Sequence, residues 1–434
     1  MRTTRIKKGI LSFIVILVIT LLVLPEFYEK KSAFSAGNDT YKNLRLFNEI
    51  LNLIETNYVE DVNPDVIIDG AINGMIKTLD PHSTYMSAET YKELRINTKG
   101  AFGGLGIEIT MIDDAITVVS PIEDTPAFIA GVKSGDQIVG IDGKSTKGFT
   151  LEDAVHKLRG KTGTKVTITV RRKDLDKPKD FVITRAIIKL TSVKHKVYRD
   201  NIGYVRISSF QETTTKELQK VLNIITKEVS PLKGLILDLR NNPGGILEQS
   251  IKVSDAFLKS GIIVSTKGKT KKSETVYNAR DDGIEPECPI IVLINGASAS
   301  ASEIVSGALQ DNERAILLGT QTFGKASMQV VIPLKTGAAL KLTTGKYYTP
   351  SGRLIQAKGI SPDIEIEYVR PDENQKQPKQ IREKDLKGHI AGEKETEEVK
   401  KPEKKSDGSK KDNQLSRAID ILKSWELFTR MKEG

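Results

Sequence analysis

The sequence has few of the residues on which many enzyme classes depend. Among its 434 residues there is one cysteine, Cys288, and there are four histidines. A single cysteine excludes a disulfide scaffold within the chain. Because Cys288 precedes the apolar run 289–294, it is expected at the start of a buried strand and not as a reactive thiol. The sequence also lacks an H-E-x-x-H motif and an acidic cluster with ligand spacing, so no metal and no other cofactor is expected.

The net charge of +10 does not come from a basic surface element. Lysine and arginine are mixed with acidic residues along the chain, and much of the positive surplus lies in the two terminal regions. No basic stripe interleaved with aromatic residues occurs. Nucleic-acid binding is therefore not expected.

One long uncharged run occurs, residues 9–25, and it follows cations at positions 2, 5, 7 and 8. This pattern is typical of a signal peptide or membrane anchor, here residues 1–36. The run is near the lower length limit for a membrane span, and the positive-inside rule places the rest of the chain outside the cytoplasm. Ala33-Phe34-Ser35 is a poor cleavage site, which favours an uncleaved anchor over a cleaved signal peptide.

Changes in hydrophobic periodicity divide the remaining chain and predict a mixed α/β protein. Residues 38–98 have helical periodicity, and their apolar face is compatible with a homodimer or with packing on the chain's own core. Residues 99–187 predict a compact β-module with two short helices, and residues 188–370 a larger α/β domain with buried strands. Residues 371–412 predict a polar charged linker, and residues 413–434 a final helix.

A segment rich in serine and alanine, Asn295–Ile304, lies between an expected buried strand and an expected helix. The N–H groups at a helix N-terminus have no partner within the helix and can stabilise a developing oxyanion. A serine in this segment is therefore a candidate nucleophile. An ordinary serine helix cap is the alternative.

The base that would activate such a serine is expected to be a lysine. A Ser–His–Asp triad needs a histidine, but none of His82, His156, His195 and His389 has a neighbouring acidic residue in the sequence that suggests one. A lysine becomes a base where burial lowers its pKa. Lys325 is flanked by small and apolar residues that suit a half-buried amine, although an exposed surface lysine remains the alternative.

A third candidate element is the segment Asp238–Gly245, which ends an expected buried strand in a Gly-Gly turn. Backbone N–H groups exposed in such a turn can complete an oxyanion hole. The alternative is an ordinary turn in which glycine is needed for a positive φ.

In chain order, these motifs resemble the C-terminal processing peptidases, also called tail-specific proteases. The resemblance covers about residues 40–370 and the last short helix. Its segments are residues 74–83, Gly104–Ile107, Asp238–Gly245, Ser300–Glu303, Thr322–Gln329, Tyr347–Arg353 and Lys358–Asp363. It implies an N-terminal helical region, an inserted PDZ domain at residues 99–187 and a serine peptidase core with a Ser–Lys dyad at residues 188–370.

The resemblance also implies roles for individual residues. Ser300 is the implied nucleophile, and its neighbours Ser298 and Ser302 are not. Lys325 is the implied general base, and Gln329 the residue that orients it. The implied chemistry is acyl transfer, in which neutral Lys325 takes the proton of Ser300 and an acyl-enzyme forms and is hydrolysed.

The implied oxyanion hole consists of backbone N–H groups. One belongs to Ala301 and the other to Gly244 or Gly245, between which the sequence does not decide. One position departs from the family pattern, because Ala326 follows the lysine where the family usually has glycine. If that position requires a positive φ, the alanine is strained.

The implied PDZ domain binds the C-terminus of a peptide as an added strand, with the carboxylate held by a glycine-rich loop. The candidates for that loop are Gly104, Leu105 and Gly106. The candidates for the side-chain pocket, each of which could instead be a core residue, are Leu105, Ile107, Val155 and Leu158. Arg159, near the helix end at Gly160, is a candidate link between peptide capture and alignment of the protease.

Together these features predict a serine endopeptidase of the bacterial cell envelope, exported or membrane-anchored, that acts on proteins or peptides with free C-termini. A first alternative is a catalytically silent, membrane-anchored scaffold that only binds C-terminal peptides. A second is a Ser/Lys hydrolase of small amides or esters, which would not need the β-module. The presence of Ser300, Lys325 and Gln329 favours the enzyme over the scaffold.

Overall fold

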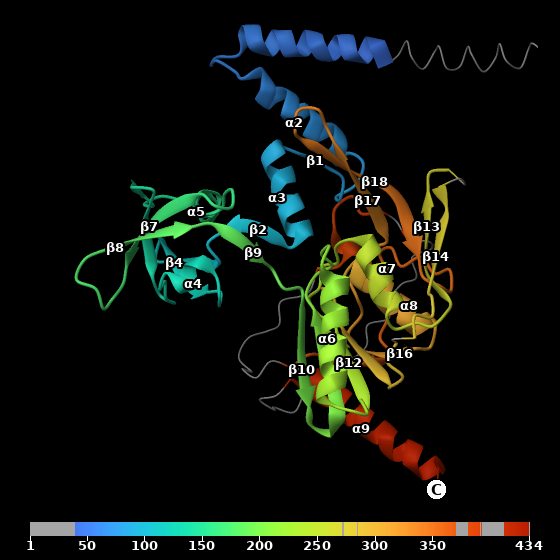
Figure 1. Cartoon of the computed structure of the whole chain (residues 1–434). Helices are drawn as coiled ribbons and strands as arrows, with labels where there is room; N and C mark the ends of the chain where they lie inside the picture. The colour runs from blue at the N-terminus through green and yellow to red at the C-terminus, as the bar shows by residue number, and fades with distance from the viewer. Residues whose placement is uncertain are drawn as a thin grey trace, which may run out of the picture. The chain divides into compact units, whose positions relative to one another are not determined.

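The computed structural model describes residues 40–270, 273–283, 285–369, 381–390, 392 and 412–433 (Figure 1). The predicted signal peptide or anchor, residues 1–36, lies outside these ranges, as does most of the predicted linker. The chain divides into two compact units, Met1–Met75 and Ile76–Gly434. Within the described ranges, no helix has the length and apolar character needed to cross a membrane.

The described part of the first unit is helical. Residues 40–57 form one helix, and α2 (Pro64–Lys77) begins after Asn63, whose side-chain oxygen accepts the N–H of Asp65 at 3.0 Å. The predicted helical periodicity is therefore confirmed. The large apolar side chains of the first helix are exposed, namely those of Tyr41, Leu44, Leu46, Phe47, Ile50 and Leu53.

The predicted β-module folds as an antiparallel sheet with strand order β3-β4-β5-β7-β8, and β6 (Lys144–Ser145) pairs with β5. The strands are β3 (Ile107–Ile112), β4 (Ala115–Pro121), β5 (Gln137–Ile141), β7 (Lys165–Arg171) and β8 (Lys179–Thr184). Two helices, α4 (Pro126–Ile129) and α5 (Leu151–Leu158), complete it. Because β3 is an edge strand, its outer backbone groups are available to an added strand.

The β-module is inserted between paired strands. The chain enters it through β2 (Ala101–Gly104) and leaves it through β9 (Ala186–Lys189), and these strands pair antiparallel. The preceding helix α3 (Ala88–Lys99) ends at Gly100, whose φ of 66° places it in the left-handed region typical of a helix C-terminus.

The larger domain is built on a six-stranded sheet with order β10-β11-β12-β15-β16-β19, parallel from β11 onward. Its strands are β10 (Val193–Tyr198), β11 (Ile202–Ile207), β12 (Gly234–Asp238), β15 (Ile290–Ile294), β16 (Ala315–Gly319) and β19 (Ile364–Glu365). One face packs on α6 (Thr214–Glu228), α7 (Leu247–Asp255) and α8 (Ala301–Asp311), and the other on α9 (Asn413–Glu433) (Figure 1). The candidate segments follow the carboxyl ends of β12 and β15, where ligands bind in sheets of this kind.

A second sheet has the order β1-β18-β13-β14, with β17 also paired to β18. Its strands are β1 (Thr84–Met86), β13 (Ile262–Gly268), β14 (Thr275–Asn278), β17 (Ser327–Pro333) and β18 (Ala339–Tyr348). The strand β1 precedes the β-module in sequence yet pairs with β18 near the C-terminal part of the domain. The turn before β1 is thereby held close to the loop that carries Lys325.

The first residues of the motif Asp238–Gly245 hold the C-terminal helix in place. Asp238 is fully buried and lies 2.7 Å from the guanidinium of Arg240. Arg240 also bonds to Asp412 at 2.8 Å and to Gln414 at 2.9 Å, just before and within α9. Burial lowers the pKa of Arg240, but its hydrogen bonds to both aspartates raise it more, to above the ordinary value. This ion-pair network anchors α9 to the sheet.

Residues 381–390 fall inside the range predicted to be a charged linker, but they pack on the larger domain. The short helix η3 (Glu383–Asp385) buries Glu383 completely, and the Glu383 N–H donates to the Phe323 carbonyl at 3.2 Å. The prediction of a solvated tether is wrong for this stretch. Its polar composition does not reveal that one of its carboxylates has partners in the interior.

Candidate active site

Ser300 lies at the turn between β15 and α8, where it forms the N-cap of the helix. Its φ of 56° and ψ of −113° are strained for a residue with a side chain. The Ser300 N–H donates to Glu303 at 2.8 Å, and the residue is half-buried. A strained serine at a strand-to-helix turn is a geometry that presents the hydroxyl at the end of a sheet.

The two neighbouring serines have structural partners instead. Ser298 and Ser302 are both fully buried. The Ser298 hydroxyl donates to the Leu239 carbonyl at 2.8 Å, and the Ser302 hydroxyl to the Asn242 carbonyl at 2.9 Å. Both hydroxyls tie the serine loop to the loop after β12, which leaves Ser300 as the candidate nucleophile.

Lys325 lies in the loop between β16 and β17. The positive φ in this loop, 99°, belongs to Gly324, and Ala326 is not among the residues with positive φ. Ala326 is fully buried, and its N–H donates to the Gln356 side chain at 2.8 Å. The alanine that departs from the family pattern therefore causes no backbone strain.

Glu303 connects the serine turn to the lysine loop. One carboxylate oxygen accepts the N–H groups of Ser300 and Lys325 at 2.8 and 2.9 Å. The other accepts the Thr322 hydroxyl at 2.6 Å and the Gly324 N–H at 2.7 Å. Burial raises the pKa of Glu303 to about 7, against these hydrogen bonds, which lower it. The sequence reading missed this role, because a glutamate three residues after a serine at a helix start indicates an ordinary cap.

The Lys325 amine lies in a mixed electrostatic environment. Burial, and next the positive charge of Lys341, lower the pKa of Lys325 to about 8. The carboxylates of Glu383, Glu303 and Asp80 act in the opposite direction. The result is a lysine that is neutral in a useful fraction near physiological pH, as a general base requires.

Gln329 lies on β17, next to an irregularity in its pairing with β18. Its amide nitrogen donates to the Ser327 hydroxyl at 2.9 Å, to the Ser327 carbonyl at 3.1 Å and to the Thr343 hydroxyl at 3.2 Å. Gln329 therefore lies on the strand that follows the lysine loop, and its amide is directed to Ser327 and Thr343.

Two of the candidate oxyanion residues, Ala301 and Gly244, adjoin Ser300. Ala301 is the buried first residue of α8. Gly244 has a φ of 98°, and a Cβ there would lie 2.9 Å from the Ser300 Cβ and 3.0 Å from the Ala301 nitrogen. Glycine is required because any side chain would occupy the space beside the nucleophile. The Gly244 N–H donates to the Asn242 side chain at 2.9 Å, whereas no hydrogen bond of the Gly245 N–H is found within the described residues.

Tyr347 is a buried neighbour of Ser300 that the sequence reading placed only within a motif. Within the described part of the chain, its hydroxyl has no hydrogen-bond partner. Burial raises the pKa of Tyr347 well above its ordinary value, and the interaction with the Ser300 side chain lowers it in part. The Tyr347 N–H donates to the Ala326 carbonyl at 2.9 Å, so the residue also contacts the lysine loop.

Two histidines have acidic partners that the sequence did not reveal. The His82 side chain bonds to Glu383 at 2.7 Å, 301 positions away, and that of His156 lies 3.2 Å from Glu89. Neighbours in the sequence therefore do not reveal the acidic partners of these histidines. Neither pair is joined to Ser300 by a hydrogen bond among the described residues.

In the β-module, the structure separates the peptide-site candidates into two groups. Leu105 and Leu158 are buried members of the module's core. Ile107, on the edge strand β3, is half-buried and packs against the same core. Val155, on α5, is also half-buried, and both residues remain candidates for a pocket. Gly106 has a φ of 79°, and a side chain there would collide with Thr125.

The other two candidates lie at the ends of β2 and α5. Gly104 is the buried last residue of β2, which leads into the loop. The Arg159 guanidinium lies 4.5 Å from the centre of the Phe102 ring and 3.9 Å from the Glu93 carboxylate of α3. Arg159 therefore links the end of α5 to the strand and helix that lead into the module.

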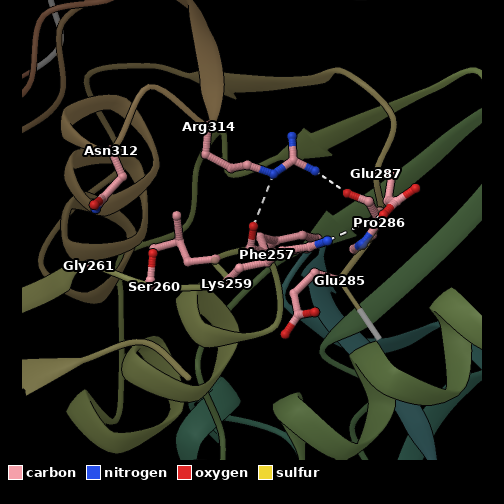
Figure 2. A pocket seen from close by; sticks show the side chains of 10 residues that line it. Phe257, Lys259, Ser260, Gly261, Glu285, Pro286, Glu287, Asn312 and Arg314 are labelled. Atoms are coloured by element: carbon pink, nitrogen blue, oxygen red, sulfur yellow. Dashed lines mark hydrogen bonds and ion pairs between the residues drawn. The ribbon is translucent and has the colours of Figure 1, made fainter. Parts of the chain in front are cut away.

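A cavity in the larger domain contains none of the predicted site residues (Figure 2). Arg314 lines it and donates to the carbonyls of Phe257 at 3.0 Å and Cys288 at 3.2 Å, and to that of Pro286. Cys288 is buried just before β15, as expected, and burial raises the pKa of its thiol to about 11. Arg314 thus holds backbone segments together, and the candidate chemistry lies at Ser300.

Comparisons with known proteins agree with this geometry. Residues 201–366 match the model of peptidase family S41, residues 103–181 that of the PDZ domain, and residues 25–90 that of the N-terminal domain of the activating protease CtpB. A carboxy-terminal-processing protease of Bartonella bacilliformis is 48% identical over 395 residues, which cover 89% of each chain. The carboxy-terminal processing protease CtpA of Bacillus subtilis is 37% identical over 340 residues, 78% of this chain and 71% of that one.

Among solved structures, a photosystem II D1 C-terminal processing protease is 28% identical and aligns with a TM-score of 0.44 over 74% of this chain and 92% of its own. The mixed α/β fold with a helical N-terminal region and an inserted PDZ domain is the expected one. Because the Bartonella relative is similar over most of both chains, we conclude that this chain belongs to peptidase family S41 and is a serine protease that carries a PDZ domain.

Proposed function

We propose that the protein is an endopeptidase that captures the C-terminal region of protein substrates in its PDZ domain and cleaves them with a Ser300–Lys325 dyad. The observation that carries the proposal is the position of Glu303. Its buried carboxylate binds the backbone of both dyad residues, at 2.8 Å from the Ser300 nitrogen and 2.9 Å from the Lys325 nitrogen. The nucleophile and the base are thus held by a single side chain.

In the proposed reaction, neutral Lys325 takes the proton from the Ser300 hydroxyl as the oxygen attacks the substrate carbonyl. The lysine then returns the proton to the leaving amine, and an acyl-enzyme remains. Water, deprotonated by the same lysine, hydrolyses the ester. Gln329 would orient the lysine amine after its amide turns away from Ser327 and Thr343.

The proposed oxyanion hole consists of the N–H groups of Ala301 and Gly245. Gly245 is favoured over Gly244 because the Gly244 N–H already donates to Asn242 at 2.9 Å. Gly244 contributes by leaving room beside Ser300, since a Cβ there would lie 2.9 Å from the serine Cβ. Two preorganised backbone donors stabilise the negative charge that develops on the carbonyl oxygen.

Substrate capture is assigned to the groove between β3 and α5. A peptide C-terminus that adds to the open edge of β3 would place its terminal side chain near Ile107 and Val155, which are half-buried. The relatives named above are carboxy-terminal processing proteases, in keeping with this assignment. The same groove would serve the alternative, a silent peptide-binding scaffold.

We further propose that residues 1–36 export the protein or anchor it in the bacterial cell envelope, because four cations precede an uncharged run there. The helix of residues 40–57 exposes a row of large apolar side chains, among them Leu44, Phe47 and Leu53. A surface of this kind fits the same surface of a second copy, so a homodimer is proposed.

The test uses the full-length protein in detergent and an unfolded reporter with an apolar C-terminus. Ser300→Ala and Lys325→Ala should each lower kcat by at least about 1,000-fold, because each removes one half of the dyad. Lys335→Ala, at an exposed position between β17 and β18, is the control and should cleave normally. Equal cleavage by the parent and both dyad variants would refute the dyad. Peptide binding without cleavage by the parent would favour the scaffold.

A further inference from the structure

A buried carboxylate near Lys325 has no part in the proposed chemistry. Glu383 has no exposed side-chain area, although it lies in a segment rich in charged residues. Its two oxygens lie 2.7 and 2.8 Å from the ring nitrogen Nε2 of His82, and one of them accepts the Gln356 side-chain N–H at 2.9 Å. A fully buried carboxylate with this many partners is costly to create and indicates a specific role.

The contacts of Glu383 lead to both sides of Lys325. Gln356, which donates to Glu383, accepts the Ala326 N–H at 2.8 Å. The Glu383 N–H donates to the Phe323 carbonyl at 3.2 Å. The residue two before Lys325 thus bonds directly to the segment 381–390, and the residue after Lys325 is linked to the same segment through Gln356. A loop fixed at both ends keeps the lysine side chain in a narrow range of positions.

The charged groups around Lys325 come from several elements. Glu303 lies on α8, Lys341 on β18 and Asp80 in the turn before β1, and each interacts with the Lys325 amine, as does Glu383. Tyr347, on β18, interacts with both Glu303 and Glu383. His82 faces Glu383 from the turn that follows Asp80. Glu383 is therefore one of three carboxylates that balance two half-buried lysines.

We propose that Glu383 is a positioning residue for Lys325, which fixes the lysine loop through its side-chain bond to Gln356 and its backbone bond to Phe323. The proposal rests on the assignment of Lys325 as the base in the proposed function. It makes residues 381–390 part of the proposed active site.

The test is Glu383→Gln in the full-length protein, with kcat and KM measured from pH 6 to pH 10 on the reporter described above. The variant keeps the shape and loses the charge. We expect kcat to fall roughly 10- to 100-fold, because a neutral amide holds His82 and Gln356 less firmly than the carboxylate does and the lysine loop is then less well fixed. KM should change less than about twofold, because the substitution lies outside the PDZ domain. The acid limb of kcat/KM should move to lower pH, since the carboxylate favours the protonated lysine.

The matched control is Asp385→Asn, two residues away in the same short helix. Asp385 is exposed and accepts the Arg382 N–H at 2.9 Å, a bond that asparagine retains. Its kinetics and pH profile should equal those of the parent. A purely structural role of Glu383 would lower the melting temperature and the active fraction but leave the acid limb in place, and that result would overturn the proposal.

If Glu383→Gln shows no cooperative melting, Gln356→Met carries the test, because it removes the link to Ala326 and keeps the Glu383 charge. A fall in kcat of at least about tenfold with unchanged KM would support the proposal, and parental kcat would refute it. The dyad variants distinguish a failure of the proposed function from a failure of the positioning role of Glu383. If Lys325→Ala retains parental kcat, the proposed function fails. If the dyad is required and Glu383→Gln behaves as the parent, only the positioning role fails.

Discussion

The two candidate sites of the molecule are built in opposite ways. Around Ser300 and Lys325, the backbone is held by buried side chains, and Glu303 and Gln356 each bond to more than one segment. At the proposed peptide groove of the PDZ domain, β3 is an edge strand, and Ile107 and Val155 are half-buried. Catalysis requires groups fixed to within a fraction of an ångström. Peptide capture requires an unpaired strand edge and a surface that accepts different side chains.

The buried charges of the two domains show the same contrast. In the PDZ domain, Asp136 is almost fully buried and pairs with Arg172 at 2.6 Å. Neither residue is a candidate for the peptide site. In the protease core, Glu303 has no cationic partner among its hydrogen bonds and binds backbone N–H groups and one hydroxyl instead. One carboxylate stabilises a fold, whereas the other holds the backbone of the proposed active site. Substitutions should therefore affect stability in the first case and turnover in the second.

Among substitutions that test this contrast, Glu303→Gln is expected to lower kcat the most. The amide can accept hydrogen bonds with only one of its two ends, so one pair of donors around Ser300 or Gly324 loses its acceptor. Misplacement of the nucleophile or the base by about 1 Å can cost roughly 100-fold in rate. We expect kcat to fall by at least that factor, measured on the unfolded reporter, while peptide affinity at the PDZ domain is unchanged.

Ser306→Ala is the matched control for Glu303→Gln. Ser306 is also fully buried on α8, but its hydroxyl donates to the Ser302 carbonyl at 2.8 Å within the same helix. The control should keep kcat within about threefold, since it loses one neutral hydrogen bond. If both variants lose activity equally, Glu303 acts through the stability of α8, and the contrast drawn above is wrong.

The second prediction concerns pH. Lys325 must be neutral to accept a proton, and its pKa is lowered to about 8 by burial and by Lys341. Below that value kcat/KM should fall about tenfold per pH unit, and above it should level off. Binding of a peptide by backbone N–H groups should change little from pH 7 to pH 9. If peptide affinity falls at low pH as much as kcat/KM does, the titrating group controls peptide binding and is not the catalytic base.

Much of this arrangement could be predicted from the sequence, because local patterns encode it. The serine turn follows an apolar strand, and Lys325 lies in a recognisable loop, so both dyad candidates were found. The roles of Glu303 and Glu383 could not be read in the same way. Glu303 resembles a helix cap, and Glu383 lies in a stretch whose composition indicates solvation. Its partner His82 is 301 positions away, a contact that only the folded chain creates.

The smallest effect is expected in the groove, where Val155→Asp places a charge on the half-buried face of α5. An apolar C-terminal side chain would then meet a carboxylate, so its affinity should fall by about tenfold, the effect of losing one buried apolar contact. Fluorescence anisotropy with a peptide that has a free C-terminus measures this, and an amidated peptide shows how much the carboxylate contributes. Val182→Asp is the matched control, because Val182 is 63% exposed on β8 at the opposite edge of the sheet.

The kinetic outcome of Val155→Asp decides whether the two sites are as distinct as their construction indicates. Capture of the substrate in a separate groove predicts a higher KM for the reporter and a kcat within about twofold of the parent. Unchanged peptide affinity would exclude Val155 from the pocket. A large fall in kcat at saturating reporter would mean that occupancy of the groove also aligns the dyad, for which Arg159, between Phe102 and Glu93, lies in a suitable place. The proposed peptide groove and the proposed active site would then be coupled, and they would differ only in how exposed their side chains are.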